Sequence, residues 1–138
     1  MDSRLLIYPM FALVVLTSTV LVRLFRARVR AVSTGAVGAA YFRTYQAGTE
    51  PEETAKLSRH FTNLFESPVL FYVGCLAAMV LDHVSALLLA LAWLYVIARA
   101  VHTFVHTGSN RLRPRIAAYA ASWLVLLTMW VVLVVSAS

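Results

Sequence analysis

The sequence carries polar and charged side chains at helical spacing within segments that are otherwise apolar. They are Arg59, Asn63 and Glu66 in one segment, Arg99, His102 and His106 in a second, and Arg115 with Tyr119 in a third. At ~100° per residue, each group falls on one side of a helix. Several cations around a carboxylate and an amide suit a small anionic ligand, because guanidinium groups bind carboxylates through paired hydrogen bonds.

Such a cationic pocket would also favour the thiolate form of a thiol. The single cysteine, Cys75, lies deep in an apolar run and is a poor source of that thiol. A thiol-bearing anionic cosubstrate therefore fits better. One cysteine also excludes a disulfide framework and a metal site built from thiolates.

The elements that position these residues must be membrane helices. Of the 138 residues, 61% are hydrophobic and 13% charged, and the mean hydropathy is +0.78, which is too apolar for an ordinary soluble domain. This length leaves room for about four spans of ~20 residues. We therefore expect an all-α integral membrane protein, a single domain that forms a four-transmembrane-helix bundle. Ionisable groups inside such spans are expensive and face a partner or a water-filled cavity.

Apolar runs predict spans over residues 5–30, 57–81, 84–107 and 115–136. Pro68 predicts a kink in the second span, beside the Arg59–Glu66 stripe. The short turn at Asp82 and His83 makes the second and third spans antiparallel neighbours. Residues 33–56 form the one long loop of the prediction, and within it a short helix is expected to begin near Pro51 and to run on into the second span.

The net charge of +6 reflects eleven arginines and one lysine against six acidic residues, and ten of these twelve basic residues gather at the span boundaries. Arg23, Arg26, Arg28 and Arg30 follow the first apolar run, and three further arginines lie between the third and fourth spans. By the positive-inside rule both connections face the cytoplasm, and both termini lie on the other side. The cluster is read as a set of topology signals and lipid-headgroup anchors, with a ligand role open for Arg23. No aromatic-interleaved basic stretch lies elsewhere, so a nucleic-acid partner is not expected.

Other interpretations of the site residues stay open at this point. Glu66 is a candidate ligand contact and also a candidate ion-pair partner of Arg59 or Arg99, and the two roles do not exclude each other. Tyr119, at the edge of a span, is equally an interface anchor. The histidines His102 and His106 lack a third ligand, so no metal is predicted.

Taken together, the motifs resemble the MAPEG family, the membrane-associated proteins in eicosanoid and glutathione metabolism. The resemblance covers nearly the whole chain. It is carried by Val22-Arg23-Leu24 before a basic cluster, Arg59-x-x-x-Asn63-x-x-Glu66 with a following proline, Arg99-x-x-His102, and Arg115 with Tyr119. It implies a four-helix bundle assembled as a homotrimer, with glutathione bound between adjacent subunits near the cytoplasmic face.

By this resemblance most of the polar residues match glutathione-pocket positions. They are Arg23, Arg59, Asn63, Glu66, Arg99 and His102, and we add His106 and Tyr119 as cofactor-binding candidates. Arg115 matches the arginine proposed to stabilise the thiolate, which makes it the catalytic candidate. The chain departs from the family where Thr62 replaces a second arginine and where His106 replaces a tyrosine.

Two functions follow as hypotheses. The first is a membrane glutathione-dependent transferase or peroxidase that acts on lipophilic electrophiles or lipid hydroperoxides, which enter from the bilayer lipids. The alternative is a non-catalytic protein of the same fold that binds a lipid or another anionic ligand. Thr62 and His106 keep this alternative open.

Overall fold

The computed structural model describes residues 2–46 and 48–137, which form helices and connecting turns. The elements are η1 (Ser3–Leu6), α1 (Ile7–Ser33), α2 (Tyr41–Thr44), α3 (Glu52–Asn63), α4 (Ser67–Val80), α5 (Ala86–Thr107) and α6 (Leu112–Ala137). Four helical stretches are long and apolar enough to cross a membrane, namely Ser3–Ser33, Glu52–Val80, Ala86–Thr107 and Leu112–Ala137. The prediction of an all-α protein with four spans is therefore confirmed.

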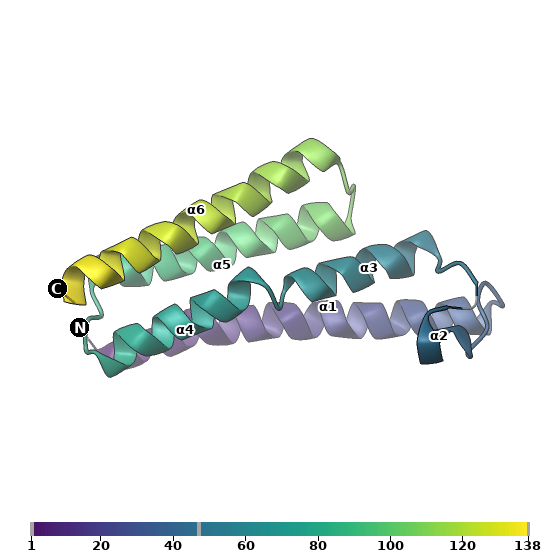
Figure 1. The fold of residues 1–138 in the computed structure, drawn as a ribbon, viewed down its shortest axis with the longest axis horizontal. Helices are drawn as coiled ribbons and strands as arrows, with labels where there is room; N and C mark the ends of the chain where they lie inside the picture. The colour runs from purple at the N-terminus through teal and green to yellow at the C-terminus, as the bar shows by residue number, and fades with distance from the viewer. Residues whose placement is uncertain (1, 47, 138) are drawn as a thin grey trace.

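The helices run roughly side by side in an up-and-down arrangement (Figure 1). α5 packs most extensively on α6, while α1 packs along α3 and α5. Both termini and the α4–α5 connection lie at one end of the bundle, and the α1–α3 connection and the α5–α6 turn lie toward the other (Figure 1). The two basic connections thus share one end.

The second span differs from the expected kinked helix because it is broken. α3 ends at Asn63 and α4 begins at Ser67, with Glu66 at φ −93° and ψ −100° between them. Pro68 has no N–H to donate, and its ring would clash with the carbonyl of the preceding turn. It therefore fits the start of α4 rather than the interior of one continuous helix. Glu66 consequently does not continue the helical face of Arg59 and Asn63.

α6 begins at Leu112, earlier than the expected residue 115, and Pro114 lies in its first turn. Proline is tolerated there, since the first N–H groups of a helix have no partner within the helix. At the other end of the bundle, the Ser85 hydroxyl accepts a hydrogen bond from the Leu88 N–H at 3.1 Å and caps the start of α5.

The apolar core fills the half of the bundle nearest the termini. Its buried side chains are Leu6, Leu13, Phe71, Cys75, Ala78, Val84, Leu88, Ala92, Tyr95, Val96, Leu126, Met129 and Leu133. The Phe71 and Tyr95 rings stack at 4.6 Å between centroids. At Gly74, α4 comes so close to α6 that an added Cβ would lie 2.9 Å from the Met129 Cε atom. This half is held together by packing.

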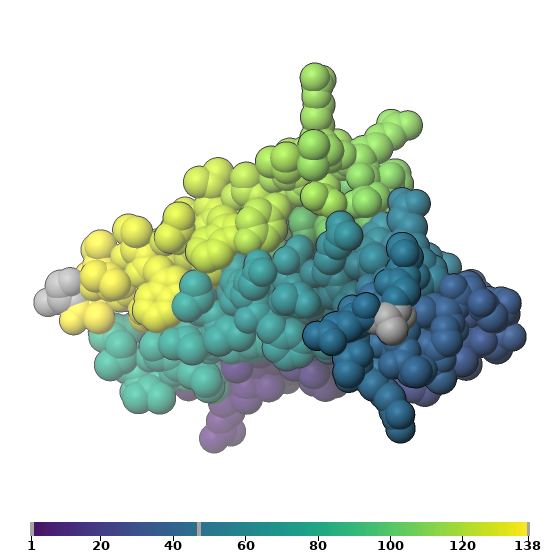
Figure 2. Space-filling model, turned by 45° about the vertical axis from the view of Figure 1, so that its right-hand side comes forward, coloured from purple at the N-terminus to yellow at the C-terminus, as the bar shows by residue number. Residues whose placement is uncertain are grey.

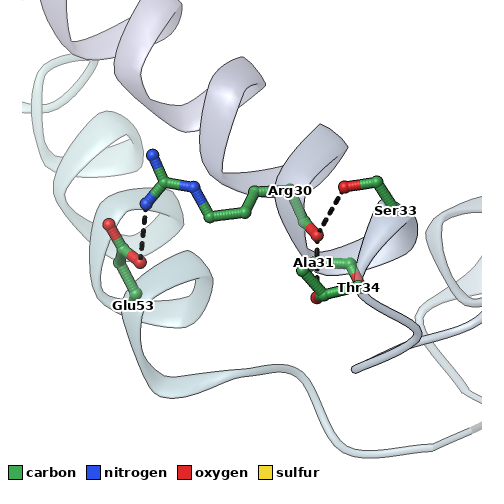
Figure 3. Close-up of polar contacts among 5 residues, drawn as sticks. All are labelled: Arg30, Ala31, Ser33, Thr34 and Glu53. Carbon is green, nitrogen blue, oxygen red and sulfur yellow. Dashed lines mark hydrogen bonds and ion pairs between the residues drawn. The ribbon is translucent and has the colours of Figure 1, made fainter.

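The opposite half buries polar side chains beside two small apolar clusters. The polar side chains are Thr54, His60, Arg99, His102, Thr103, His106 and Thr107. At its outer end Arg30 of α1 reaches Glu53 in the first turn of α3, with 3.9 Å between Nη1 and Oε2 (Figure 3). Their side chains are 70% and 61% exposed, so this ion pair contributes little stability. The candidate site lies in this polar half.

Candidate functional site

Most of the predicted site residues surround one set of adjoining pockets. A pocket of about 200 Å³ is lined by Asn63, His102, His106, Arg115, Ile116 and Tyr119. A second, of about 320 Å³, is lined by Arg59, Thr62, Asn63, His106 and Arg115. A third, of about 600 Å³, extends from Arg59, His106 and Arg115 to the loop before α3, where Glu50 and Lys56 also line it. His106 and Arg115 line all three, which makes them the centre of the site.

Arg99 is fully buried and lines none of these pockets; it lies behind Asn63 and Tyr119, which do. Its Nη2 donates to the Asn63 carbonyl oxygen at 3.1 Å, so the guanidinium caps the C-terminal end of α3 where the chain leaves the helix. The Cζ atom also lies 5.9 Å from the centroid of the Tyr119 ring. Within the described residues, Arg99 Nε and Nη1 are buried without a hydrogen-bond partner. Two nitrogen atoms of a buried cation, which carry three N–H bonds, therefore have no acceptor in the described chain.

Glu66 is exposed in the α3–α4 break. Its Oε2 accepts a hydrogen bond from the Tyr119 hydroxyl at 3.3 Å. The ion pair found in the described part of the chain joins Arg30 to Glu53, so neither Arg59 nor Arg99 pairs with Glu66 within 4.0 Å. The interpretation of Glu66 as an internal salt bridge is wrong for this structure, and its carboxylate keeps room for a ligand.

The backbone of α6 fixes the orientation of His102. His102 Nδ1 lies 3.2 Å from the Arg115 carbonyl oxygen. Because a carbonyl only accepts, Nδ1 carries the proton, and Nε2 is left as a buried acceptor without a partner in the described chain. Arg115 is itself held from the turn, since its Nη1 donates to Asn110 Oδ1 at 3.0 Å.

Sequence reasoning missed a pair of hydrogen-bonded threonines that join α5 to its neighbours. The Thr103 hydroxyl donates to the Arg99 carbonyl oxygen at 2.9 Å and lies 2.9 Å from His60 Nε2. Since its one proton is used, it accepts from His60. One turn later the Thr107 hydroxyl donates to the Thr103 carbonyl oxygen at 2.8 Å and accepts from Arg23 Nη1 at 2.9 Å.

These contacts give Arg23 a structural partner. It joins α1 to α5, and it does not line the three pockets described above. The sequence feature that could have indicated these contacts is the spacing of the two threonines, which lie at i and i+4 on α5 and directly follow His102 and His106. Threonine is common in membrane helices, so the spacing alone did not single these residues out.

Three imidazoles pack together at the pockets, where His102 and His106 belong to the lining and His60 lies behind them. The centroid of the His60 ring lies 5.4 Å from that of His102 and 4.8 Å from that of His106. No group of three histidine, cysteine or acidic side chains in the described ranges is placed to hold a metal ion. The rings serve as packed, polar walls of the site.

The charges around the pockets are mostly positive. Arg59, Arg115 and Lys56 line them, while Arg99 and Glu66 contact two of the lining residues, Asn63 and Tyr119. An anion with more than one acidic group would find complementary charges here.

The comparisons with known proteins give one match. The family model described as MAPEG family matches residues 6–135. Comparison with curated proteins and with solved structures found no match.

Proposed function

The chain belongs to the MAPEG family, and from this membership and the geometry of its pockets we propose that it is a membrane glutathione-dependent transferase or peroxidase. The observation that carries the proposal is the buried Arg99 guanidinium, whose Nε and Nη1 have no partner in the described residues, beside pockets that Arg115 lines throughout. An anionic, thiol-bearing ligand would satisfy the first residue and be activated by the second.

The residues present fit glutathione, which carries two carboxylates, an ammonium group, two amides and a thiol. The pockets of about 320 and 600 Å³ fall in the range of ~300–1,000 Å³ usual for ligand sites. Arg59 and Arg99 would bind carboxylates, Asn63 an amide, and Glu66 the ammonium group. Arg23 is left out of this set, because its guanidinium is engaged with Thr107.

When bound, glutathione supplies the nucleophilic sulfur. Arg115 would stabilise the thiolate through its positive charge, and its hydrogen bond to Asn110 holds the guanidinium in place beforehand. The His102 Nε2 acceptor and the Tyr119 hydroxyl would orient the ligand in the innermost pocket. The expected substrates are lipophilic electrophiles or lipid hydroperoxides that reach the pocket from the bilayer.

The assembly and orientation belong to the same proposal. The family fold is a homotrimer, so a neighbouring subunit would complete the pocket. Ten of the twelve basic residues lie in, or directly flank, the α1–α3 connection and the α5–α6 turn. Both connections are at the same end of the bundle (Figure 1). The positive-inside rule places this end in the cytoplasm.

The test is the ultraviolet difference absorbance of the glutathione thiolate, recorded while purified protein in detergent is titrated with glutathione. We expect a saturable signal that Arg115→Ala removes. Arg113→Ala is the matched control, because it deletes the same charge from an exposed position of α6. Calorimetry measures binding separately from thiolate formation.

Absence of both binding and signal at millimolar glutathione would refute this function and favour the non-catalytic alternative. One observation supports that alternative: the Thr62 hydroxyl donates to the Ser58 carbonyl oxygen of its own helix at 3.2 Å and supplies no cation to the pocket. An anionic lipid or metabolite that copurifies with the protein would then identify the ligand.

A further inference from the structure

The arginines of α1 divide between two sides of the helix. Arg23 and Arg30 face the bundle, where they contact Thr107 of α5 and Glu53 of α3 (Figure 3). Arg28 lies on the opposite side of α1 and is half-buried, with its Cζ atom 5.4 Å from the centroid of the Phe42 ring and 5.6 Å from that of Tyr45. The function proposed above does not use Arg28 or these two rings.

Arg28 is held by this aromatic pair but has no anionic partner. Its Nε is buried without a hydrogen-bond partner in the described chain, and the described residues offer no ion pair to its guanidinium. Stacking on Phe42 and Tyr45 restrains the long side chain, so less conformational freedom is lost when an anion binds. The short helix α2 and the turn after it place both rings here, at the end of the bundle that carries the loop (Figure 2).

An apolar groove begins at Arg28. It measures about 490 Å³ and is lined by Phe25, Arg28, Val29, Val32, Ser33 and Phe42. The lining is therefore apolar apart from one cation and one hydroxyl, which is the composition of a site for an amphiphile with an anionic head.

Toward the middle of the span, the same side of α1 presents an exposed apolar stripe. Val14, Leu21 and Phe25 share one side of α1 at ~100° per residue, and 47%, 48% and 65% of their surfaces are exposed. At ~1.5 Å per residue, the distance from Phe25 back to Val14 is about 16 Å. This is about half of a ~30 Å hydrocarbon core, the depth that one acyl chain covers.

We propose that this groove binds an anionic phospholipid of the surrounding bilayer, with the phosphate on the Arg28 guanidinium and an acyl chain along Phe25 and Val14. Charge favours this occupant, because Arg43, which follows Phe42 in α2, is also exposed near the same membrane boundary, and basic residues there attract anionic headgroups. The site is separate from the proposed glutathione pocket, and this proposal does not depend on glutathione binding.

The test is native mass spectrometry of the full chain in detergent, titrated with phosphatidylglycerol or with phosphatidylcholine of the same acyl chains. We expect phosphatidylglycerol to bind more tightly, and Arg28→Gln to lower its affinity about tenfold. Arg30→Gln, which removes the same charge two residues away, should change the affinity less than twofold. Val29→Trp, which fills the groove and keeps the arginine, should also weaken binding, while circular dichroism confirms that the helices remain.

Several outcomes would overturn the proposal. Equal losses in Arg28→Gln and Arg30→Gln would show a diffuse basic surface rather than a site, and equal binding of the two lipids would remove the role of the phosphate. Competition by soluble glycerol phosphate at the lipid's own concentration would identify a free phosphate site. A change of oligomeric state in Val29→Trp without loss of lipid would show that a second copy of the chain covers the groove.

Discussion

Replacing Thr103 with valine removes a hydroxyl that connects two helices while preserving the shape of the side chain. The hydroxyl accepts from His60 Nε2 at 2.9 Å, and both residues are buried. In Thr103→Val the His60 N–H stays buried without an acceptor, and such a group costs about 1–3 kcal/mol. The lost bond to the Arg99 carbonyl contributes little, because that oxygen remains an acceptor within the helix. We therefore expect the free energy of unfolding to fall by about 1–3 kcal/mol.

The measurement is equilibrium unfolding in mixed micelles, followed by circular dichroism. Thr128→Val is the matched control, because the Thr128 hydroxyl donates to the Leu124 carbonyl at 2.8 Å in the same way but is exposed. It should cost at most about 0.5 kcal/mol. In a His60→Phe background the penalty of Thr103→Val should shrink, with a coupling of about 1–2 kcal/mol. Equal penalties in both threonine variants, or an additive double variant, would refute the hydrogen-bond chain from α3 to α5.

Two further variants test the pocket edge and the apolar core. Glu66→Gln should change the free energy of unfolding by less than about 0.5 kcal/mol, because Glu66 is exposed and its contact with the Tyr119 hydroxyl is long at 3.3 Å. Glutathione affinity, measured by calorimetry, should nevertheless fall about tenfold; loss of the oligomer in detergent would instead indicate a structural role. Ser67→Ala leaves the buried Tyr95 hydroxyl without its partner at 2.9 Å and should cost about 1–3 kcal/mol in micelle unfolding. Adding Tyr95→Phe should recover part of that loss, and failure to do so would contradict the pairing.

The sequence predicts the number and type of the spans because long apolar runs have few other interpretations. It does not predict the break between Asn63 and Ser67. The periodicity argument assumes one continuous helix through residues 59–66, so it assigns Glu66 to the same face as Arg59. Pro68 indicates a disturbance, but the outcome also depends on Arg99, distant in sequence, whose Nη2 caps the Asn63 carbonyl. A local pattern contains no information about that donor.

The site residues are likewise predictable only where the spacing within one helix determines their position. Arg99, His102 and His106 share a helix face, so spacing alone groups them, and the structure buries all three. His60 follows Arg59 directly and therefore points about 100° away from the pocket-facing side. It packs onto Thr103 of α5 instead. Tertiary packing decides which of these two adjacent residues faces the pocket and which faces a neighbouring helix. The sequence pattern of a single helix does not carry this information.

The contrast between the two halves of the bundle explains why the ligand site lies where it does. The half near the termini is filled by side chains such as Leu13, Phe71 and Leu126, and the buried hydroxyls of Ser67 and Tyr95 pair with each other there. The other half is joined by hydrogen bonds, and among its described atoms Arg99 Nε, Arg99 Nη1 and His102 Nε2 remain buried without partners. Each such atom costs about 1–3 kcal/mol in the free protein. A ligand that pairs with them removes this cost on binding, so the same residues that weaken the free bundle provide affinity for an anion.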